Sequence, residues 1–369
     1  MNKFFESSVI WFLGFFSFTA YESNCMRKKI DPLKNSTLDD VARYAGVSSA
    51  TVSRCLNNPD VVSERSRRKI EAAINILSYV PHAAARTLAS NKSYMIGAIV
   101  PSLDSTLFGR ALEAFQNCIS RSGYTMVVAS TNYDAEKEYS HIRKMVSHGV
   151  DAVLLIGGSR DESAYSLLNN SRIPYVITWT TDDADKHPCV GFDNYDAASK
   201  ITEYLIGLGH SRFAMISGIL NGNDRACSRL QGVRDTLAQR ELRLSDEFVI
   251  ERPFGIEHGQ DAFRYLMSRC PRPTAIICGS DPFAYGAVFE SKILGVDVPR
   301  DVSITGFDDT WLALNLSPPL TTLRTPQQQI GLKAAEYLIS RLSGEEVAAP
   351  SALDVELIIR ESCSSPSTV

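Results

Sequence analysis

The chain has 369 residues, of which 44% are hydrophobic and 22% are charged, and its formal net charge is −4. Such a composition is typical of a soluble globular protein of two or three domains, and it excludes a largely disordered chain, a collagen and a protein with many membrane spans. The eight cysteines form no CxxC pair and have no close histidine partner. This argues against a zinc ribbon, a redox motif or a disulfide framework and fits a reducing cytoplasm.

The charge is distributed unevenly along the chain. Residues 27–93 contain twelve basic and six acidic side chains and so carry +6, whereas the residues after 93 carry −9. A small basic module joined to a larger acidic body predicts a polyanionic partner for the small module only.

The first 25 residues contain an apolar stretch at residues 9–20 (VIWFLGFFSFTA), which follows Lys3. This stretch has the outline of a signal peptide, and it is shorter than the roughly 20 residues that a membrane span needs. The other interpretation is that residues 1–25 are translated upstream sequence and that Met26 is the true start.

Three short helices are predicted between residues 37 and 77. Each follows a side chain that can accept a hydrogen bond from the first turn of the helix; these residues are Thr37, Ser48 and Ser63. Asp40 lies three residues after Thr37 and completes a capping box, and Gly46 can end the first helix in the left-handed conformation. Pro81 stops the run of helices.

Residues 38–57 (LDDVARYAGVSSATVSRCLN) have the signature of a helix–turn–helix. Ala42 is small where two helices must cross closely, and Val47 and Val52 can fill the space between the helices. The second helix then exposes small and polar side chains that suit a major groove: Ser49, Ala50, Thr51, Ser53, Arg54 and Asn57. From these residues alone, an ordinary helical hairpin with a solvated polar face remains an alternative.

After residue 93 the pattern changes to short apolar, β-branched runs that alternate with amphipathic helices. The predicted strands are residues 95–100, 125–129, 152–156, 175–178, 213–217, 275–278 and 302–306. The predicted helices include residues 106–121, 136–147, 196–208, 225–240, 258–269 and 283–294. Strands without polar alternation between helices indicate parallel sheets covered on both faces, and about 270 residues of this pattern favour two α/β subdomains over one.

Short motifs in a fixed order carry a family resemblance. In the basic module they are residues 37–57, 62–63 (VS), 79–81 (YVP) and 88–89 (LA). In the core they are residues 190–194 (VGFDN), 209–210 (GH), 229–232 (RLQG), 303–309 (SITGFDD), 320–322 (LTT) and 357–362 (LIIRES). Any one motif is a weak signal, but joined in this order over residues 37–362 they resemble the LacI/GalR family of bacterial transcription regulators.

The resemblance implies an α/β fold with a three-helix headpiece and a hinge helix, joined to a periplasmic-binding-protein-like core of two parallel-sheet subdomains. The expected parts are an N-terminal extension at 1–35, the helix–turn–helix domain at 36–81, the hinge at 82–93 and the core at 94–369. Within the core, the N-subdomain is expected at about 94–191 and 323–352, and the C-subdomain at about 192–320 and 353–363.

The resemblance also implies a homodimeric repressor that binds a pseudo-palindromic DNA operator in the cytoplasm. Such a protein has no use for a secretion signal, so we expect Met26 to be the true start. The alternative is an exported, periplasmic-type sugar receptor. An exported receptor, however, would not carry a basic helix–turn–helix between its signal and its core.

The resemblance places Ser49, Ala50 and Arg54 at the base edges of the operator. Arg54 can donate two hydrogen bonds to guanine O6 and N7, whereas Ser49 and Ala50 are too short for a bidentate contact and offer a hydroxyl and a methyl-sized surface. Leu88 matches the hinge leucine that wedges into the minor groove and kinks the duplex. The other expected DNA contacts are Thr37, Ser48, Thr51, Ser53, Asn57, Tyr79 and His82.

The effector site is expected between the two core subdomains. Its implied polar residues, Arg229, Asp281 and Asp308, supply a guanidinium and two carboxylates that suit hydroxyl-rich ligands. The implied flat walls are Phe108, Trp179 and Phe254. Many family members have asparagine where this chain has Ser280. Residues 101–103 (PSL) and 188–194 (PCVGFDN) are closest to the gluconate-repressor branch, so the predicted effector is a sugar or a sugar acid such as gluconate.

An enzyme is not expected. The sequence has no Ser/His/Asp order, no HExxH and no phosphate-binding loop, and its glycines after strands lack the GxGxxG spacing. Four histidines have no convincing partners in the sequence: His141, His148, His187 and His258. We therefore expect no metal and no cofactor.

Overall fold

A computed structural model of the chain describes residues 36–80, 92–103, 106–181, 186–348 and 352–367. The chain divides into two compact units, Met1–His82 and Ala83–Val369. The predicted N-terminal extension lies outside the described residues, as does the predicted hinge apart from Lys92 and Ser93. No helix in the described part of the chain is long and apolar enough to cross a membrane.

The first unit contains the three predicted helices. These are α1 (Leu38–Ala45), α2 (Ser49–Asn57) and α3 (Glu64–Leu77), with the short 3-10 helix η1 (Pro59–Val61) before α3. The three predicted N-caps are confirmed, since each side chain accepts a hydrogen bond from a backbone N–H in the first turn. The pairs are Thr37 with Asp40, Ser48 with Thr51 and Ser63 with Ser66. Gly46 ends α1 with a φ of 68°, a conformation that costs glycine little.

These helices meet in a small apolar core. The predicted core residues Ala42 and Val52 are buried, and Val47 is half-buried and packs against them. The other buried side chains come from all three helices and from the segment after α3: Val41, Ala45, Cys55, Ile70, Ala73 and Tyr79. Since Ala42 is small, α1 and α2 can cross closely, as the helix–turn–helix requires.

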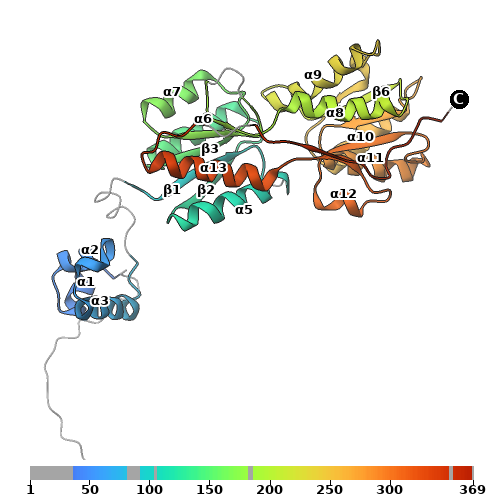
Figure 1. Ribbon diagram of the computed structural model, residues 1–369. Helices are drawn as coiled ribbons and strands as arrows, with labels where there is room; N and C mark the ends of the chain where they lie inside the picture. The colour runs from blue at the N-terminus through green and yellow to red at the C-terminus, as the bar shows by residue number, and fades with distance from the viewer. Residues whose placement is uncertain (1–35, 81–91, 104–105, 182–185, 349–351, 368–369) are drawn as a thin grey trace, which may run out of the picture. The chain divides into compact units, whose positions relative to one another are not determined.

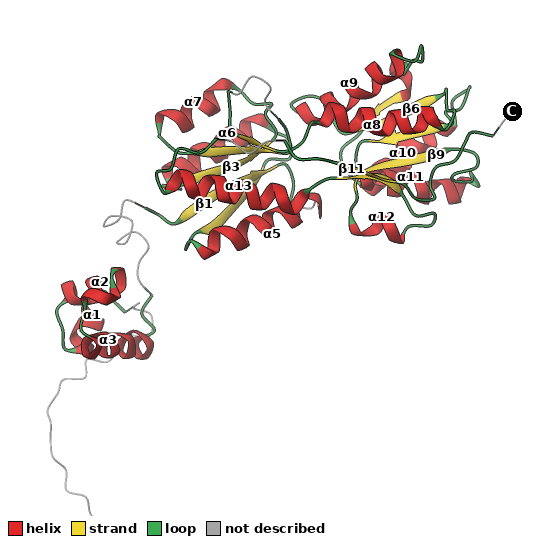
Figure 2. Cartoon of the chain, in the orientation of Figure 1, coloured by secondary structure: helices red, strands yellow, loops and turns green. Residues whose placement is uncertain are grey.

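The second unit contains two sheets, each with helices on both faces (Figures 1 and 2). The first sheet has the strand order β2-β1-β3-β4-β5, and all its pairs are parallel. Its strands are β1 (Met95–Val100), β2 (Thr125–Ser130), β3 (Ala152–Ile156), β4 (Tyr175–Thr178) and β5 (Cys189–Val190). Its helices are α5 (Thr106–Arg121), α6 (Ala135–Ser147), α7 (Glu162–Asn170) and α13 (Gln327–Leu342).

Alternate residues of β1 face opposite layers of this subdomain. Ile96 and Ala98 pack in the cluster that contains side chains of α5 and α13, whereas Ile99 packs in the cluster with α6 and α7. Because both faces are covered, the strands are apolar throughout, as the sequence pattern predicted.

The second sheet has the order β11-β10-β9-β8-β6-β7 and is parallel except for the pair of β10 and β11. Its strands are β6 (Phe213–Ser217), β7 (Val249–Glu251), β8 (Ala275–Cys278), β9 (Ser303–Asp308), β10 (Thr321–Arg324) and β11 (Glu356–Ile358). Its helices are α8 (Asn194–Gly207) and α9 (Asp224–Ala238) on one face and α10 (Ile256–Met267) and α11 (Asp281–Leu294) on the other. The short helices α12 (Trp311–Asn315) and η2 (Asp246–Phe248) lie in its loops.

The chain passes between the two sheets three times. It crosses from β5 to α8, from β10 to α13, and from α13 back to β11. The second crossing follows Arg324, so the predicted subdomain boundary at residues 320–323 falls within β10. These crossings leave the carboxyl ends of the parallel strands of both sheets next to the junction of the subdomains, where open α/β sheets bind their ligands.

Candidate functional site

Helix α2 presents one polar face to solvent. Ala50 and Arg54 are exposed on it, while Ser49, Thr51 and Ser53 are half-buried. The opposite face carries the buried Val52 and Cys55. The exposed guanidinium of Arg54 takes part in no ion pair among the described residues, so its donors are available to another molecule.

The hydroxyls around the N-terminus of α2 are engaged with one another and with α1. The Oγ of Ser48 and the Oγ1 of Thr51 lie 2.8 Å apart, and Ser49 Oγ donates to Asp39 Oδ1 of α1 at 2.5 Å. Thr37 caps α1 and donates its hydroxyl proton to Asp40 Oδ2 at 2.7 Å. The hydrogen bond between Ser49 and Asp39 holds the start of α2 against α1, and the other two stabilise the N-termini of the separate helices.

Four other predicted DNA contacts differ in their placement. Tyr79 is buried in the core of the headpiece, and this burial raises the pKa of its phenol. The structure therefore gives Tyr79 a packing role within this unit. His82 and Leu88 lie outside the described residues, and the same holds for the side chain of Asn57.

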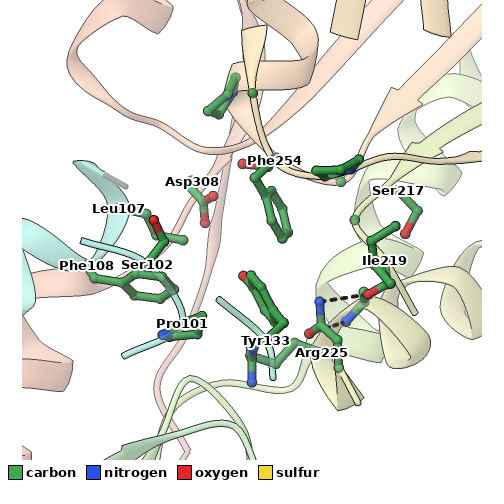
Figure 3. Close-up of a pocket in the computed structure, with 18 of the residues that line it drawn as sticks. Pro101, Ser102, Leu107, Phe108, Tyr133, Ser217, Ile219, Arg225, Phe254 and Asp308 are labelled. Carbon is green, nitrogen blue, oxygen red and sulfur yellow. Dashed lines mark hydrogen bonds between the residues drawn. The ribbon is translucent and has the colours of Figure 1, made fainter. Parts of the chain in front are cut away.

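A cavity of about 790 Å³ lies between the two subdomains of the core. Five of the six predicted effector residues line it: Phe108, Trp179, Arg229, Phe254 and Asp308. Figure 3 shows Phe108 with Pro101 and Ser102 on one side of this cavity and Phe254 on another, with the carboxylate of Asp308 between them. We call this cavity the cleft.

Arg229, in α9, is buried and held from three sides. Its Nε donates to Asn194 Oδ1 at 2.9 Å and one terminal nitrogen donates to the Gly279 carbonyl at 2.6 Å. The guanidinium carbon lies 3.5 Å from the centroid of the Phe307 ring. Burial lowers the pKa of Arg229 to about 10, although the nearby Asp308 acts in the opposite direction, so the group is positively charged at neutral pH.

Asp308 is the last residue of β9 and has a φ of 114°, which is strained for a residue with a side chain. Its Oδ1 accepts a weak hydrogen bond from Thr325 Oγ1 at 3.4 Å, whereas its buried Oδ2 has no hydrogen-bond partner among the described residues. Burial raises the pKa of Asp308 to about 8, and the charge of Arg229 opposes this shift. The cleft thus holds a carboxyl group whose protonated form is favoured by burial and one of whose oxygens has no hydrogen-bond partner in the described chain.

Aromatic rings form much of the cleft wall. Trp179, at the end of β4, packs edge-on against Phe108 with ring centroids 5.1 Å apart. Trp179 has a φ of 64°, and its buried Nε1 has no hydrogen-bond partner in the described chain. Phe254 stacks on Tyr133 with a centroid distance of 5.6 Å (Figure 3). It also stacks on Phe283, with a centroid distance of 5.3 Å.

Asp281 is not in the cleft lining, contrary to the sequence-based expectation. Its carboxylate is fully buried beneath the cleft and accepts hydrogen bonds from the Thr310 backbone N–H and from Thr322 Oγ1, each at 2.7 Å. Tyr285 donates a third at 3.3 Å. Burial raises the pKa of Asp281 to about 7. The role that the structure supports is to tie α11 to β10 and to the loop after β9.

The sequence analysis missed the polar residues at the start of α9. Asp224 Oδ2 accepts a hydrogen bond from the backbone N–H of Gly158, in the other subdomain, at 2.7 Å. Asp224 Oδ1 accepts one from Arg225, which lines the cleft, at 3.0 Å. Gly157 has a φ of 72°, and a Cβ there would collide with the guanidinium of Arg225. Asp224 and Arg225 therefore hold the two subdomains together at one end of the cleft.

Two other cleft residues were also missed. Ser217, at the end of β6, lines the cleft and has a buried Oγ without a hydrogen-bond partner among the described residues. Tyr133 has a φ of 61°, and burial raises the pKa of its phenol although the charge of Arg225 opposes this shift. The only available signal was that Ser217 ends a predicted strand and that Tyr133 lies in the loop after another, because ligands of α/β sheets bind at the carboxyl ends of the strands.

Comparisons with known proteins agree with this arrangement. Residues 37–82 match the model of "Bacterial regulatory proteins, lacI family", and residues 202–363 match that of "Periplasmic binding protein-like domain". A similar relative is the HTH-type transcriptional repressor PurR of Vibrio vulnificus, which is 32% identical over 317 residues, or 84% of this chain and 93% of the relative.

Two solved structures have a similar fold. The transcription regulator GntR from Chromobacterium violaceum has a TM-score of 0.69 and 32% identity over 73% of this chain and 98% of that one. The lac repressor dimer bound to operator and the anti-inducer ONPF has a TM-score of 0.79 and 27% identity over 90% of this chain and 100% of that one. These proteins are transcriptional regulators rather than enzymes, in agreement with the prediction. By its identity to curated relatives over most of its length, the chain belongs to the lacI family of bacterial regulatory proteins.

Proposed function

We propose that this protein is a cytoplasmic, homodimeric repressor whose headpiece binds a pseudo-palindromic operator and whose cleft binds a small, hydroxyl-rich effector. The observation that carries the proposal is the pairing of a capped helix–turn–helix with a cleft that contains three buried polar atoms without a hydrogen-bond partner among the described residues. A lac repressor in complex with operator and a ligand shares the fold over 90% of this chain. The exported sugar receptor is not favoured, since it leaves the headpiece without a function.

For the DNA, the proposed base contacts are Ser49, Ala50 and Arg54. The exposed Arg54 can donate two hydrogen bonds to one guanine, which contributes about 1–3 kcal/mol of discrimination. The other proposed contacts are Thr37 at the N-terminus of α1, Ser48 and Thr51 at the N-terminus of α2, and Ser53 in the middle of α2, whose hydroxyls are suited to the phosphates beside those bases. Asn57, His82 and Leu88 remain proposals from the family resemblance alone.

For the dimer, the proposed interface includes helices α11 and α12 of the core. Both helices expose large apolar side chains in the single chain, and these are Phe289, Ile293, Trp311 and Leu314. Apolar side chains three or four residues apart lie on one face of a helix, so each helix presents an apolar stripe. A second copy of the chain that covers these stripes accounts for their exposure.

For the effector, the unpartnered atoms define what a ligand must supply. Trp179 Nε1 needs an acceptor, Ser217 Oγ can donate or accept, and Asp308 Oδ2 needs a donor when ionised and an acceptor when protonated. Sugar hydroxyls can act in both senses, and sugar rings and chains also pack against flat walls such as Phe108 and Phe254. These groups support a carbohydrate-type ligand.

The charge of the cleft favours a sugar acid. Asp224 neutralises Arg225 by a direct ion pair, whereas Arg229 faces Asp308, whose raised pKa leaves it mostly neutral at pH 7. Arg229 is therefore a buried positive charge without a full counter-charge. A ligand carboxylate supplies that counter-charge, so we propose a sugar acid such as gluconate.

The proposed switch uses the two sides of the cleft. Phe108 and Trp179 belong to one subdomain, and Arg229 and Asp308 to the other. A ligand that contacts both sides binds the closed form more tightly than the open form, and this difference is what shifts a conformational equilibrium. A change in subdomain closure would then alter operator affinity by a coupling of about 1–3 kcal/mol.

The effector is tested by thermal unfolding of the purified protein with gluconate and with glucitol. These two compounds differ only in a carboxylate against a hydroxymethyl group, so they separate the sugar-acid proposal from a general carbohydrate site. A ligand that binds only the native state raises the melting temperature. We expect gluconate to raise it more than glucitol, and a shift with neither compound would refute the proposed ligand class.

The DNA function is tested by selection of sequences from a randomised duplex library. We expect enrichment of a pseudo-palindromic site, with affinity that falls steeply as salt rises. Ligand binding without any sequence enrichment would instead favour the sugar receptor.

A further inference from the structure

Asp39 is a carboxylate of α1 that lies beside the start of α2 and has no counter-charge among the described residues. It lies in the first turn of α1, is exposed, and forms no ion pair with any described residue. The nearest candidate, Arg43, pairs with Asp40 instead, at 3.1 Å. The headpiece as a whole is basic, so an unpaired negative charge on its DNA side opposes the approach of phosphates unless it gains a specific partner.

The hydrogen bond between Ser49 and Asp39 fixes what both groups can offer to DNA. Ser49 Oγ is 2.5 Å from Asp39 Oδ1 and donates its one proton to it. The Ser49 oxygen is then left only with acceptor lone pairs, and Asp39 Oδ2 accepts no hydrogen bond from a described residue. The next residue, Ala50, is exposed and has no polar group. Together, the side chains of Asp39, Ser49 and Ala50 therefore present acceptors and a methyl group, and none of the three has a free donor.

We propose that the acceptor pair of Asp39 and Ser49 reads the amino group of a cytosine in each half-site of the operator. Two bases present amino donors in the major groove, cytosine at N4 and adenine at N6. Adenine also presents the acceptor N7 beside its amino group, which a carboxylate repels, whereas the neighbour of N4 in cytosine is a C–H group. This inference rests on the proposed function, and it adds a residue of α1 to the specificity of α2.

The pair also complements Arg54 in its chemistry. Arg54 offers only donors and suits guanine O6 and N7, while Asp39 and Ser49 offer only acceptors. The recognition helix lies in the major groove with its N-terminal residues at the base edges, and the 2.5 Å hydrogen bond brings Asp39 to that end. A half-site should then contain a cytosine that depends on Asp39 and a guanine that depends on Arg54.

The test uses the full chain and a randomised double-stranded DNA library, followed by sequencing of the bound fraction. The parent, Asp39→Ala and Asp39→Asn are compared, and Glu71→Gln is the matched control, because it removes one exposed negative charge from α3 in the same unit. Circular dichroism and melting temperature confirm that each variant is folded. Binding to one enriched duplex and to its cytosine-to-adenine and cytosine-to-thymine variants then gives affinities.

We expect the parent to prefer cytosine at one position of each half-site by about tenfold. Asp39→Ala should lose this preference and bind random DNA more tightly, and Asp39→Asn should move the preference toward adenine, whose N6 and N7 an amide can bind together. Glu71→Gln should keep the cytosine. Identical sequence preferences for the parent and Asp39→Ala would overturn the inference alone, whereas a parent that enriches no sequence would overturn the proposed function with it.

Discussion

The substitution Asp308→Asn separates the charge of this residue from its shape. In the empty cleft, burial raises the pKa of Asp308 to about 8, while an unfolded aspartate has the ordinary value of 3.8. The folded state therefore keeps a proton that the unfolded state releases, so stability falls as pH rises from about 4 and stops falling above about 8. The amide of the variant does not titrate in this pH range, so Asp308→Asn should lack this part of the pH dependence of stability.

The size of this pH effect on stability follows from the pH range over which only the folded state holds the proton of Asp308. One pKa unit corresponds to about 1.4 kcal/mol, so the rise from pH 6 to pH 8 should cost the parent on the order of 2–3 kcal/mol relative to Asp308→Asn. In a core of this size, such a difference corresponds to a shift in melting temperature of roughly 5–10 °C. Asp281, whose pKa is also raised, is present in both proteins, and its charge contributes to the raised pKa of Asp308, so the difference between the proteins reports on Asp308 together with its coupling to Asp281.

The assay is thermal unfolding from pH 5 to pH 9 without ligand, with Asp354→Asn as a control at an exposed carboxylate. Binding of gluconate is measured on the same samples by calorimetry. In the parent, gluconate affinity should fall above pH 8, because an ionised Asp308 repels the ligand carboxylate, and in Asp308→Asn it should be nearly constant over that range. Parallel stability curves for the parent and the variant would refute the assignment of a raised pKa to Asp308.

Three further outcomes are expected. Arg54→Ala should weaken binding to an enriched operator by about tenfold or more while random DNA is affected less, and equal losses would make Arg54 a phosphate contact. Sedimentation at micromolar concentration should show dimers, because one second copy covers the apolar stripes of α11 and α12. Ile293→Asp should yield monomers, and a stable tetramer of the parent would contradict the expectation. Asp224→Asn should weaken gluconate binding by about tenfold in calorimetry, because the hydrogen bond from Gly158 loses its charged acceptor; unchanged affinity would show that this contact does not support the closed form.

Local signals predicted the headpiece and the long strands well. The caps of α1 to α3 depend on residues three apart, and the buried strands β1, β3 and β6 are apolar runs with turn residues on both sides. The strands β5, β7 and β11 were missed because two or three residues are too few to show a period, and β10 was missed because its sequence, TTLR, is mostly polar. Helix α13 was not among the predicted helices, although the family resemblance placed residues 323–352 in the N-subdomain; it follows a strand of the second sheet but packs against α5 in the first subdomain. A contact of that kind depends on the whole topology rather than on neighbours in the sequence.

The two carboxylates of the predicted site, Asp281 and Asp308, show what the sequence pattern could not decide, namely which of them lines the cleft and which is buried within the second subdomain. Asp281 and Asp308 both stand at the carboxyl end of an apolar strand of the second sheet. Asp308 ends β9 and lies in the cleft lining, whereas Asp281 begins α11 and accepts a hydrogen bond from Thr322, 41 residues further along the chain. Only the pairing of β9 with β10 brings Thr322 there. For the same reason Asp224 and Arg225 could not be distinguished from surface charges.

The cleft stores unfavourable free energy on both of its sides. Trp179 and Asp308 each adopt a positive φ at the end of a strand, and each buries a polar atom that has no hydrogen-bond partner in the part of the chain that the structure describes. A strained residue costs about 1–3 kcal/mol, and a buried unsatisfied group costs a similar amount. A ligand that reaches only one subdomain can satisfy one of these atoms, so the full gain requires a ligand in contact with both. Since that gain is available only when the subdomains are closed on the ligand, closure and occupancy are coupled by the placement of these two residues.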